Sequence, residues 1–138
     1  MHRFLVVVVA LSMVFVAAAC SDGGSADPQE VVEAYFAAWS AEDVDQIMTY
    51  VAPDASLEID AAGTFRNGPD EIRAAFETAF ERWDWIIEVS DFEVDGDTVS
   101  YNVVASDPEG NEIFRGRSQA TVVDGLVTAE EEIGPYQE

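Results

Sequence analysis

The sequence has few of the side chains on which nucleophilic catalysis and metal binding depend. Its 138 residues include one cysteine, one histidine and no lysine. The histidine is His2 and the cysteine is Cys20, so both lie near the N-terminus. The rest of the chain therefore cannot form a serine–histidine–aspartate site, a cysteine–histidine site or a lysine Schiff base. A zinc site of histidine and cysteine ligands and an internal disulfide are excluded for the same reason.

Positive charge is also scarce. Six arginines stand against 28 aspartates and glutamates, which gives a net charge of −22. A surface this acidic repels nucleic acid, so we expect no nucleic-acid partner. There is no glycine-rich phosphate loop and no calcium-loop spacing, so we expect no cofactor and no metal site. Acid–base chemistry then falls to aspartate, glutamate and tyrosine.

The first 20 residues have the layout of an export signal. His2 and Arg3 precede an apolar stretch over 4–19, and three alanines stand directly before Cys20. This layout is typical of a secretory signal peptide, and the stretch is shorter than the roughly 20 residues of a membrane span. The segment resembles the lipobox of prokaryotic lipoproteins, which implies lipidation of Cys20. We expect an exported chain anchored to the outer face of the cytoplasmic membrane, with an uncleaved anchor or plain secretion as alternatives.

Behind this signal (1–20) we expect a flexible spacer over 21–27, one domain over 28–134 and a short acidic tail over 135–138. The run Asp27-Pro28-Gln29-Glu30 is a strong helix start, with aspartate as the N-cap and proline in the first turn. It predicts a helix over 28–40, and the apolar spacing predicts further helices over 44–50 and 70–82.

Alternating apolar and polar residues predict five strands. Their expected ranges are 55–60, 83–94, 98–106, 112–123 and 126–133. Asp95-Gly96 and Asp124-Gly125 are hairpin signals between the last strands. The order of elements favours an α+β fold, in which a cone-shaped, curved antiparallel sheet wraps around three N-terminal helices and can enclose a cavity.

Three segments carry a family resemblance. They begin at Val31 (VVEAYFAAWSAEDVD), Tyr50 (YVAPDASLE) and Gly68 (GPDEIRAAF). Together they resemble the nuclear transport factor 2-like superfamily, and most closely its SnoaL-like polyketide cyclase and ketosteroid isomerase group, over about 28–134. The resemblance implies the cone fold, but this fold hosts enzymes, binding modules and silent domains alike.

The isomerase pattern carries over only in part. Tyr35 matches the oxyanion-hole tyrosine of that group, whereas Ile59 stands where its general base is an aspartate. The flanking acids Glu58 and Asp60 are one residue out of phase with that position. Ser118 stands where a second oxyanion donor is an aspartate. We therefore do not expect ketosteroid isomerase activity as such.

Large aromatic side chains could line a pocket for a hydrophobic ligand. The candidates are Trp39, Phe76, Phe80 and Trp85, together with Ser118. The same rings could instead fill the cone. Because Trp83 and Trp85 alternate in the expected strand over 83–94, a third interpretation is a homodimer through the sheet face.

The last expected strand carries three consecutive glutamates. If Val127, Ala129 and Ile133 face inward, a period of two places Glu131 inward and its neighbours outward. The outward glutamates would then pair with Arg115 and Arg117. A buried Glu131 would be a plausible general base or ligand anchor. The candidate catalytic set is therefore Tyr35, Glu131 and Asp60.

Three functions follow as hypotheses. The first is a lipid-anchored extracytoplasmic domain that binds a small hydrophobic molecule or a protein partner. The second is a cofactor-independent isomerase, cyclase or dehydratase that uses a carboxylate base and Tyr35. The third is a non-catalytic dimeric interaction protein. An inward carboxylate within hydrogen-bond reach of a pocket that also holds Tyr35 would favour the enzyme.

Overall fold

The computed structural model describes residues 26–59 and 63–138. Cys20 and Asp60 lie outside the described residues, so the expectations placed on them are not addressed by the structure. Among the helices that are described, none is long and apolar enough to cross a membrane.

The three expected helices are present, and the first two begin at aspartate caps. Helix α1 spans Pro28–Ser40, and the side chain of Asp27 accepts a hydrogen bond of 2.9 Å from the Gln29 amide. Helix α2 spans Val44–Thr49, with Asp43 accepting from Gln46 N at 3.0 Å. Helix α3 spans Gly68–Arg82. Each cap satisfies an amide that would otherwise lack a partner at the helix start.

Six strands form one sheet. They are β1 (Val51–Glu58), β2 (Phe65–Asn67), β3 (Ile86–Asp95), β4 (Thr98–Ser106), β5 (Glu112–Val123) and β6 (Leu126–Gly134). Their order is β2-β1-β6-β5-β4-β3. The meander from β3 to β6 is antiparallel, as expected, whereas β1 pairs with β6 in parallel. The short strand β2 was not expected from the sequence.

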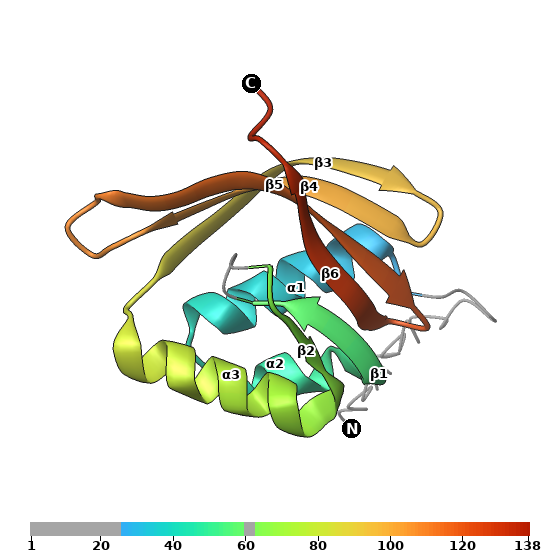
Figure 1. Cartoon of the computed structure of the whole chain (residues 1–138). Coiled ribbons are helices and arrows are strands. Elements are labelled where there is room, and N and C mark those ends of the chain that lie inside the picture. The colour runs from blue at the N-terminus through green and yellow to red at the C-terminus, as the bar shows by residue number, and fades with distance from the viewer. Residues whose placement is uncertain (1–25, 60–62) are drawn as a thin grey trace, which may run out of the picture.

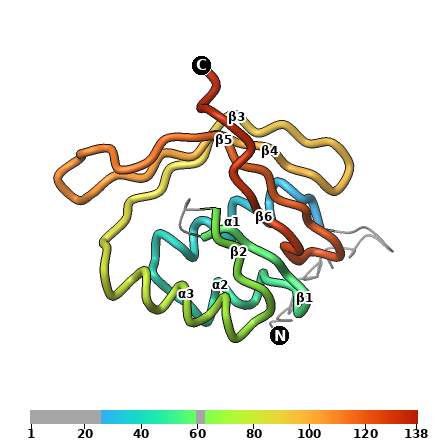
Figure 2. The backbone as a smooth tube through the Cα atoms, in the orientation of Figure 1, coloured from blue at the N-terminus to red at the C-terminus, as the bar shows by residue number. Residues whose placement is uncertain are grey.

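The sheet curves over the helices. In Figure 1, β3, β4 and β5 cross above α1, and β6 bends down toward β1 and β2, beside α2 and α3. The tube in Figure 2 shows the same arrangement, with the C-terminus leaving on the side of the sheet away from the helices. The core lies between α1 and the inner face of the sheet, where Tyr35, Tyr101, Phe76 and Leu57 are fully buried.

The strand expected over 83–94 begins later than the alternation predicted. Strand β3 starts at Ile86, and Trp83 and Trp85 lie in the connection from α3. Their rings stack, with centroids 4.9 Å apart and planes 9° from parallel. The expectation that both rings project from one strand face is therefore wrong, because parallel stacking of the two indoles takes the place of strand pairing there.

Strand β6 contains an irregularity that decides which glutamate is buried. Val122 pairs with Val127, but the preceding residue Thr121 pairs with Ala129. Thr128 is therefore an extra residue in β6 with no pairing partner in β5, and it forms a β-bulge. Its hydroxyl donates a hydrogen bond of 3.2 Å to Thr121 O. Beyond a bulge the alternation of faces is shifted by one residue.

Candidate active site

The carboxyl of Glu130 lies in the core of the domain. The residue is 5% exposed and comes from β6, next to Ala120 of β5 and Leu57 of β1. The Tyr35 hydroxyl, from α1, donates a hydrogen bond of 2.8 Å to one carboxyl oxygen. The Tyr101 hydroxyl, from β4, donates to the other at 3.1 Å. Three elements far apart in sequence therefore converge on one buried acid.

Burial raises the pKa of Glu130 from 4.5 to about 7. The hydrogen bonds from Tyr35 and Tyr101 oppose this shift, because they stabilise the ionised form, while the negative charge of Glu58 adds to it. Burial, and then the charge of Glu130, raise the pKa of both tyrosines well above the usual value. The tyrosines therefore keep their protons and act as donors, while Glu130 changes its protonation state near neutral pH.

Glu130 also lines a cavity of about 90 Å³ between α1 and the sheet. Its walls are mainly aromatic and aliphatic, with a few polar groups: Phe36, Trp39, Glu58, Ile59, Trp85, Ile87, Val103, Ala105, Phe114, Ser118, Glu130 and Glu132. An apolar pocket with a few convergent polar groups is the usual form of a small-molecule site. Its volume suits a ligand, or part of a ligand, of only a few heavy atoms.

Two further carboxylates lie along the same cavity. Glu58 is half-buried and accepts hydrogen bonds from Gly63 N at 2.8 Å and from Glu132 N at 3.1 Å. Glu132 is exposed, and its side chain passes over Gly116 on the inner face of β5. The acids thus range from buried to exposed, with Glu130 at the inner end.

Two tryptophans of the cavity wall carry unsatisfied donors. The indole nitrogens of Trp39 and Trp85 are buried and have no hydrogen-bond partner within the part of the chain that the structure describes. Trp39 is only 5% exposed, and its N–H is close enough to Tyr35 to lower the pKa of that hydroxyl slightly. Buried donors without an acceptor are uncommon in folded proteins and call for an explanation.

The expected inward orientation of Glu131 is wrong. Glu131 is exposed and pairs with Gln119 on the outer face of the sheet, while Glu130 and Glu132 face inward. The bulge at Thr128 is the physical reason, because it inverts the alternation counted from Val127.

The expected ion pairs on these strands are wrong as well. Arg115 binds Glu112 at 2.7 Å, and Arg117 binds Glu93 at 2.8 Å. Glu130 has two tyrosines as its partners instead.

The structure brings several predicted site residues together. Trp39, Trp85 and Ser118 line the cavity, and Tyr35 does not line it but binds Glu130, which does. Phe76 and Phe80 do not line it: Phe76 is fully buried against Trp39, with ring centroids 4.6 Å apart, and Phe80 packs on Phe76.

Sequence reasoning missed Tyr101 and Glu130. Tyr101 could have been found, since it alternates with Val99 and Val103 along a regular strand. Glu130 could not, because the sequence gives no sign of the bulge that turns it inward.

A second, larger hollow lies along α3. It has a volume of about 430 Å³ and runs between this helix and Trp83, with Arg66 and Arg82 at its sides. Most of its lining is exposed, and it holds no buried titratable group.

The described residues, 26–59 and 63–138, contain no group of three histidine, cysteine, aspartate or glutamate side chains that could hold a metal ion. The chemistry that the described chain offers is therefore concentrated at Glu130.

Solved structures with the same fold are numerous. A protein of Sinorhizobium meliloti assigned as a polyketide cyclase is 24% identical, with a TM-score of 0.67 over 78% of this chain and 100% of its own. A protein of Kribbella flavida assigned as a ketosteroid isomerase is 18% identical, with a TM-score of 0.63 over 80% and 79% of the two chains. The epoxide hydrolase/cyclase-like enzyme SalBIII is 22% identical, with a TM-score of 0.65 over 78% and 89%. At these identities the likeness shows the fold alone.

Sequence comparison gives the family. No curated protein sequence matches the chain significantly. The family model of the SnoaL-like domain, however, matches residues 32–130, which include Tyr35, Tyr101 and Glu130. The chain therefore belongs to the SnoaL-like domain family, within the nuclear transport factor 2-like superfamily.

Proposed function

We propose that the cavity is an acid–base active site, in which Glu130 exchanges a proton with a small bound molecule without a cofactor. The observation that carries the proposal is a buried carboxyl that lines an apolar cavity and is held by two tyrosine hydroxyls. A catalytic acid or base works best when its pKa lies near the working pH, and the pKa of about 7 meets this condition.

The reaction class we propose is proton removal next to a carbonyl group, followed by return of the proton at another atom. Isomerisation, cyclisation and elimination reactions can all begin in this way, and structural neighbours are named for the first two. Tyr35 has a different role from the one implied by the isomerase resemblance. Its proton is already donated to Glu130, so we assign it as a positioning residue rather than as an oxyanion donor.

Deuterium exchange tests this proposal without knowledge of the natural substrate. The protein is incubated in D₂O with small ketones that differ in charge: cyclopentanone, pyruvate and acetonyltrimethylammonium. We expect one of them to take up deuterium beside its carbonyl faster than in buffer. Glu130→Gln should abolish the acceleration, and Glu131→Gln, which removes a neighbouring charge on the outer face, should preserve it. Exchange that survives Glu130→Gln would contradict the assignment.

Ligand binding without catalysis is the second candidate function. The observation that favours it is the lining itself, which is predominantly apolar and aromatic and suits a small hydrophobic molecule. Native mass spectrometry of the full chain, followed by solvent extraction, would detect a retained ligand. A bound molecule together with failure of every exchange assay would favour a carrier over an enzyme.

We further propose that the protein is exported and held at the membrane by a lipid on Cys20. The support is the sequence layout of residues 1–20, a charged start, an apolar stretch and alanines before the cysteine. Metabolic labelling with a radioactive fatty acid should mark the parent chain but not Cys20→Ser. Equal labelling of both chains would overturn the anchor.

A further inference from the structure

The cavity is acidic and has no cationic residue in its described lining. Glu58, Glu130 and Glu132 all contribute to it. The chain has no lysine, and the arginines whose ion pairs the structure records, Arg73, Arg115 and Arg117, bind carboxylates elsewhere. Arg66 lines the neighbouring hollow along α3 and not this cavity. Carboxylates that lie close together in a partly buried site repel one another, so a bound cation would offset their repulsion.

The remaining walls are suited to an organic cation rather than to a bare metal ion. Four aromatic side chains line the cavity, Phe36 and Trp39 from α1, Phe114 from β5 and Trp85 from the connection before β3. Aromatic rings attract alkylammonium groups through their electron-rich faces, and clusters of such rings with acids bind them strongly. The three carboxylates do not form a group that could hold a metal ion within the described residues.

An unsatisfied donor in the wall is an independent sign of a ligand. Trp39 lines the cavity and is only 5% exposed. Its indole N–H has no acceptor in the described structure. A hydroxyl oxygen on the ligand would supply that acceptor after a small adjustment of the ring. The cavity thus combines negative charge and aromatic walls with a buried indole donor that lies near Tyr35 and makes no well-formed hydrogen bond in the described structure.

We propose that the cavity binds a small organic ammonium ion that carries a hydroxyl group, held by Glu58, Glu130, Glu132 and the surrounding aromatic side chains. The inference rests on the proposed function, since it names the ligand class of the same site. The overall charge of −22 assists it, because a negative potential attracts cations to the protein before they bind.

Protonation of Glu130 should couple to this binding. The groups that face its carboxyl are the hydroxyls of Tyr35 and Tyr101 and the carboxylate of Glu58, with Glu132 next along β6. The tyrosines stay protonated, so Glu130 is the group that titrates near pH 7. A cation favours the ionised carboxylate, so affinity should rise from pH 6 to pH 8 by up to about tenfold.

The test compares choline with 3,3-dimethyl-1-butanol, which has the same shape with carbon in place of nitrogen and is neutral. Isothermal titration calorimetry on the full chain at pH 8 is expected to give at least tenfold tighter binding of choline. Glu58→Gln and Glu132→Gln should each weaken choline several-fold. Glu131→Gln is the matched control, and it should leave the affinity within twofold because its side chain lies on the outer face.

Equal or tighter binding of the neutral alcohol would overturn the cation proposal, as would equal losses for Glu131→Gln and Glu58→Gln. Absence of binding by both ligands would overturn it too. None of these results decides the proposed function, which depends on deuterium exchange through Glu130. Choline binding without any exchange would support the ligand class and contradict the acid–base role.

Discussion

The carboxyl of Glu130 is placed where its charged form is poorly solvated. Because its pKa is raised from 4.5 to about 7 on folding, the folded chain binds this proton more tightly than the unfolded chain. The contribution of Glu130 to the free energy of unfolding is therefore greatest below pH 4.5. It is lost as the pH rises toward 7, by about 3 kcal/mol in all, since each pKa unit corresponds to about 1.4 kcal/mol.

Replacement by glutamine should remove this dependence. Glu130→Gln is neutral at every pH, and its amide can still accept a hydrogen bond from Tyr35. We expect it to match the parent near pH 4 and to exceed it by up to about 3 kcal/mol at pH 8, measured by urea unfolding. Glu131→Gln should follow the pH profile of the parent. Parallel profiles for all three proteins would contradict a buried, titrating Glu130.

The two tyrosines should tune this titration unequally. Each donates to the ionised carboxyl and so lowers its pKa, and Tyr35, at 2.8 Å, has the larger effect. Tyr35→Phe is expected to raise the pKa of Glu130 above about 7, and Tyr101→Phe to raise it less. Carbon-13 NMR titration of the Glu130 carboxyl measures both shifts. A lower pKa in either variant would show that the hydroxyl does not stabilise the ionised form.

Strand β5 contributes Phe114 and Ser118 to the cavity wall, and Gly116 lies between them. Phe114, Gly116 and Ser118 alternate on the inner face, as strand geometry requires. A Cβ on Gly116 would lie 2.7 Å from the ring of Phe114 and 3.2 Å from a carboxyl oxygen of Glu132. Because Gly116 has no side chain, Phe114 and Glu132 can occupy the space above it.

Gly116→Ala should consequently alter the cavity while retaining the fold. Phe114 must move to admit the methyl group, at a stability loss of about 1–3 kcal/mol. We expect Gly116→Ala to bind choline more weakly than the parent chain and to have a changed near-ultraviolet circular dichroism spectrum. Gln119→Ala, three residues further along β5 on the outer face, is the matched control. Unchanged binding in Gly116→Ala would show that this part of the wall does not contact the ligand.

Local chemistry was sufficient to predict the three helices and the two central strands of the meander, but it missed β2 and placed β1 at 55–60 instead of Val51–Glu58. Asp27 caps α1, which begins at Pro28 as this residue predicts, and α2 begins at Val44, where the apolar spacing predicts it. The strands over 98–106 and 112–123 have the predicted bounds, because hairpin signals and alternation agree there.

The prediction from sequence failed where tertiary contacts determine the backbone conformation. The stacking of Trp83 on Trp85 delays β3, and the bulge at Thr128 exchanges Glu131 for Glu130 at the site. A single extra residue in one strand thus decided the identity of the central acid.

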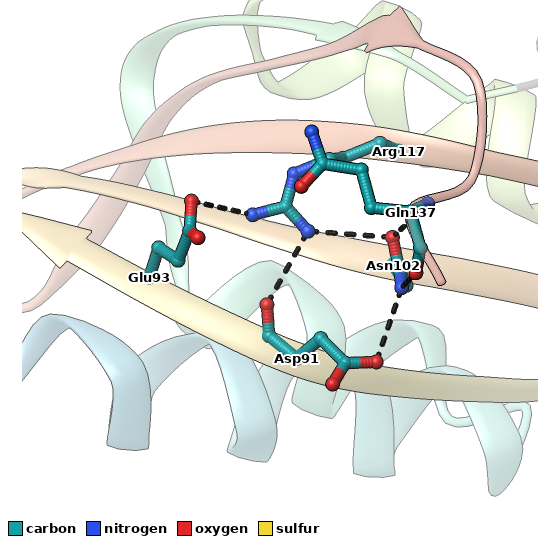
Figure 3. Close-up of polar contacts among 5 residues, drawn as sticks. All are labelled: Asp91, Glu93, Asn102, Arg117 and Gln137. Atoms are coloured by element: carbon teal, nitrogen blue, oxygen red, sulfur yellow. Dashed lines mark hydrogen bonds and ion pairs between the residues drawn. The ribbon is translucent and has the colours of Figure 1, made fainter.

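The outer face of the sheet connects the C-terminus to three strands. Asn102 of β4 is fully buried, and its amide binds both the N–H and the C=O of Gln137, at 3.1 and 2.6 Å. The same amide contacts Asp91 of β3 and Arg117 of β5, and Arg117 continues to Glu93 (Figure 3). Arg117 is 3% exposed, so this network shields a nearly buried cation with polar groups.

Asn102→Ala should disrupt this network as a whole. It removes a partner from the nearly buried guanidinium of Arg117 and both hydrogen bonds to the backbone of Gln137. A buried group that loses its partner costs about 1–3 kcal/mol, and an exposed one costs less. We expect a loss of about 2–4 kcal/mol in urea unfolding and faster hydrogen exchange at the Gln137 amide. Ser100→Ala, on the same face of β4, should change neither. The titration of Glu130 on the opposite face should also stay near pH 7, because the two polar clusters are separated by the sheet. A shifted titration in Asn102→Ala would show that the tail and the cavity are energetically coupled through the strands.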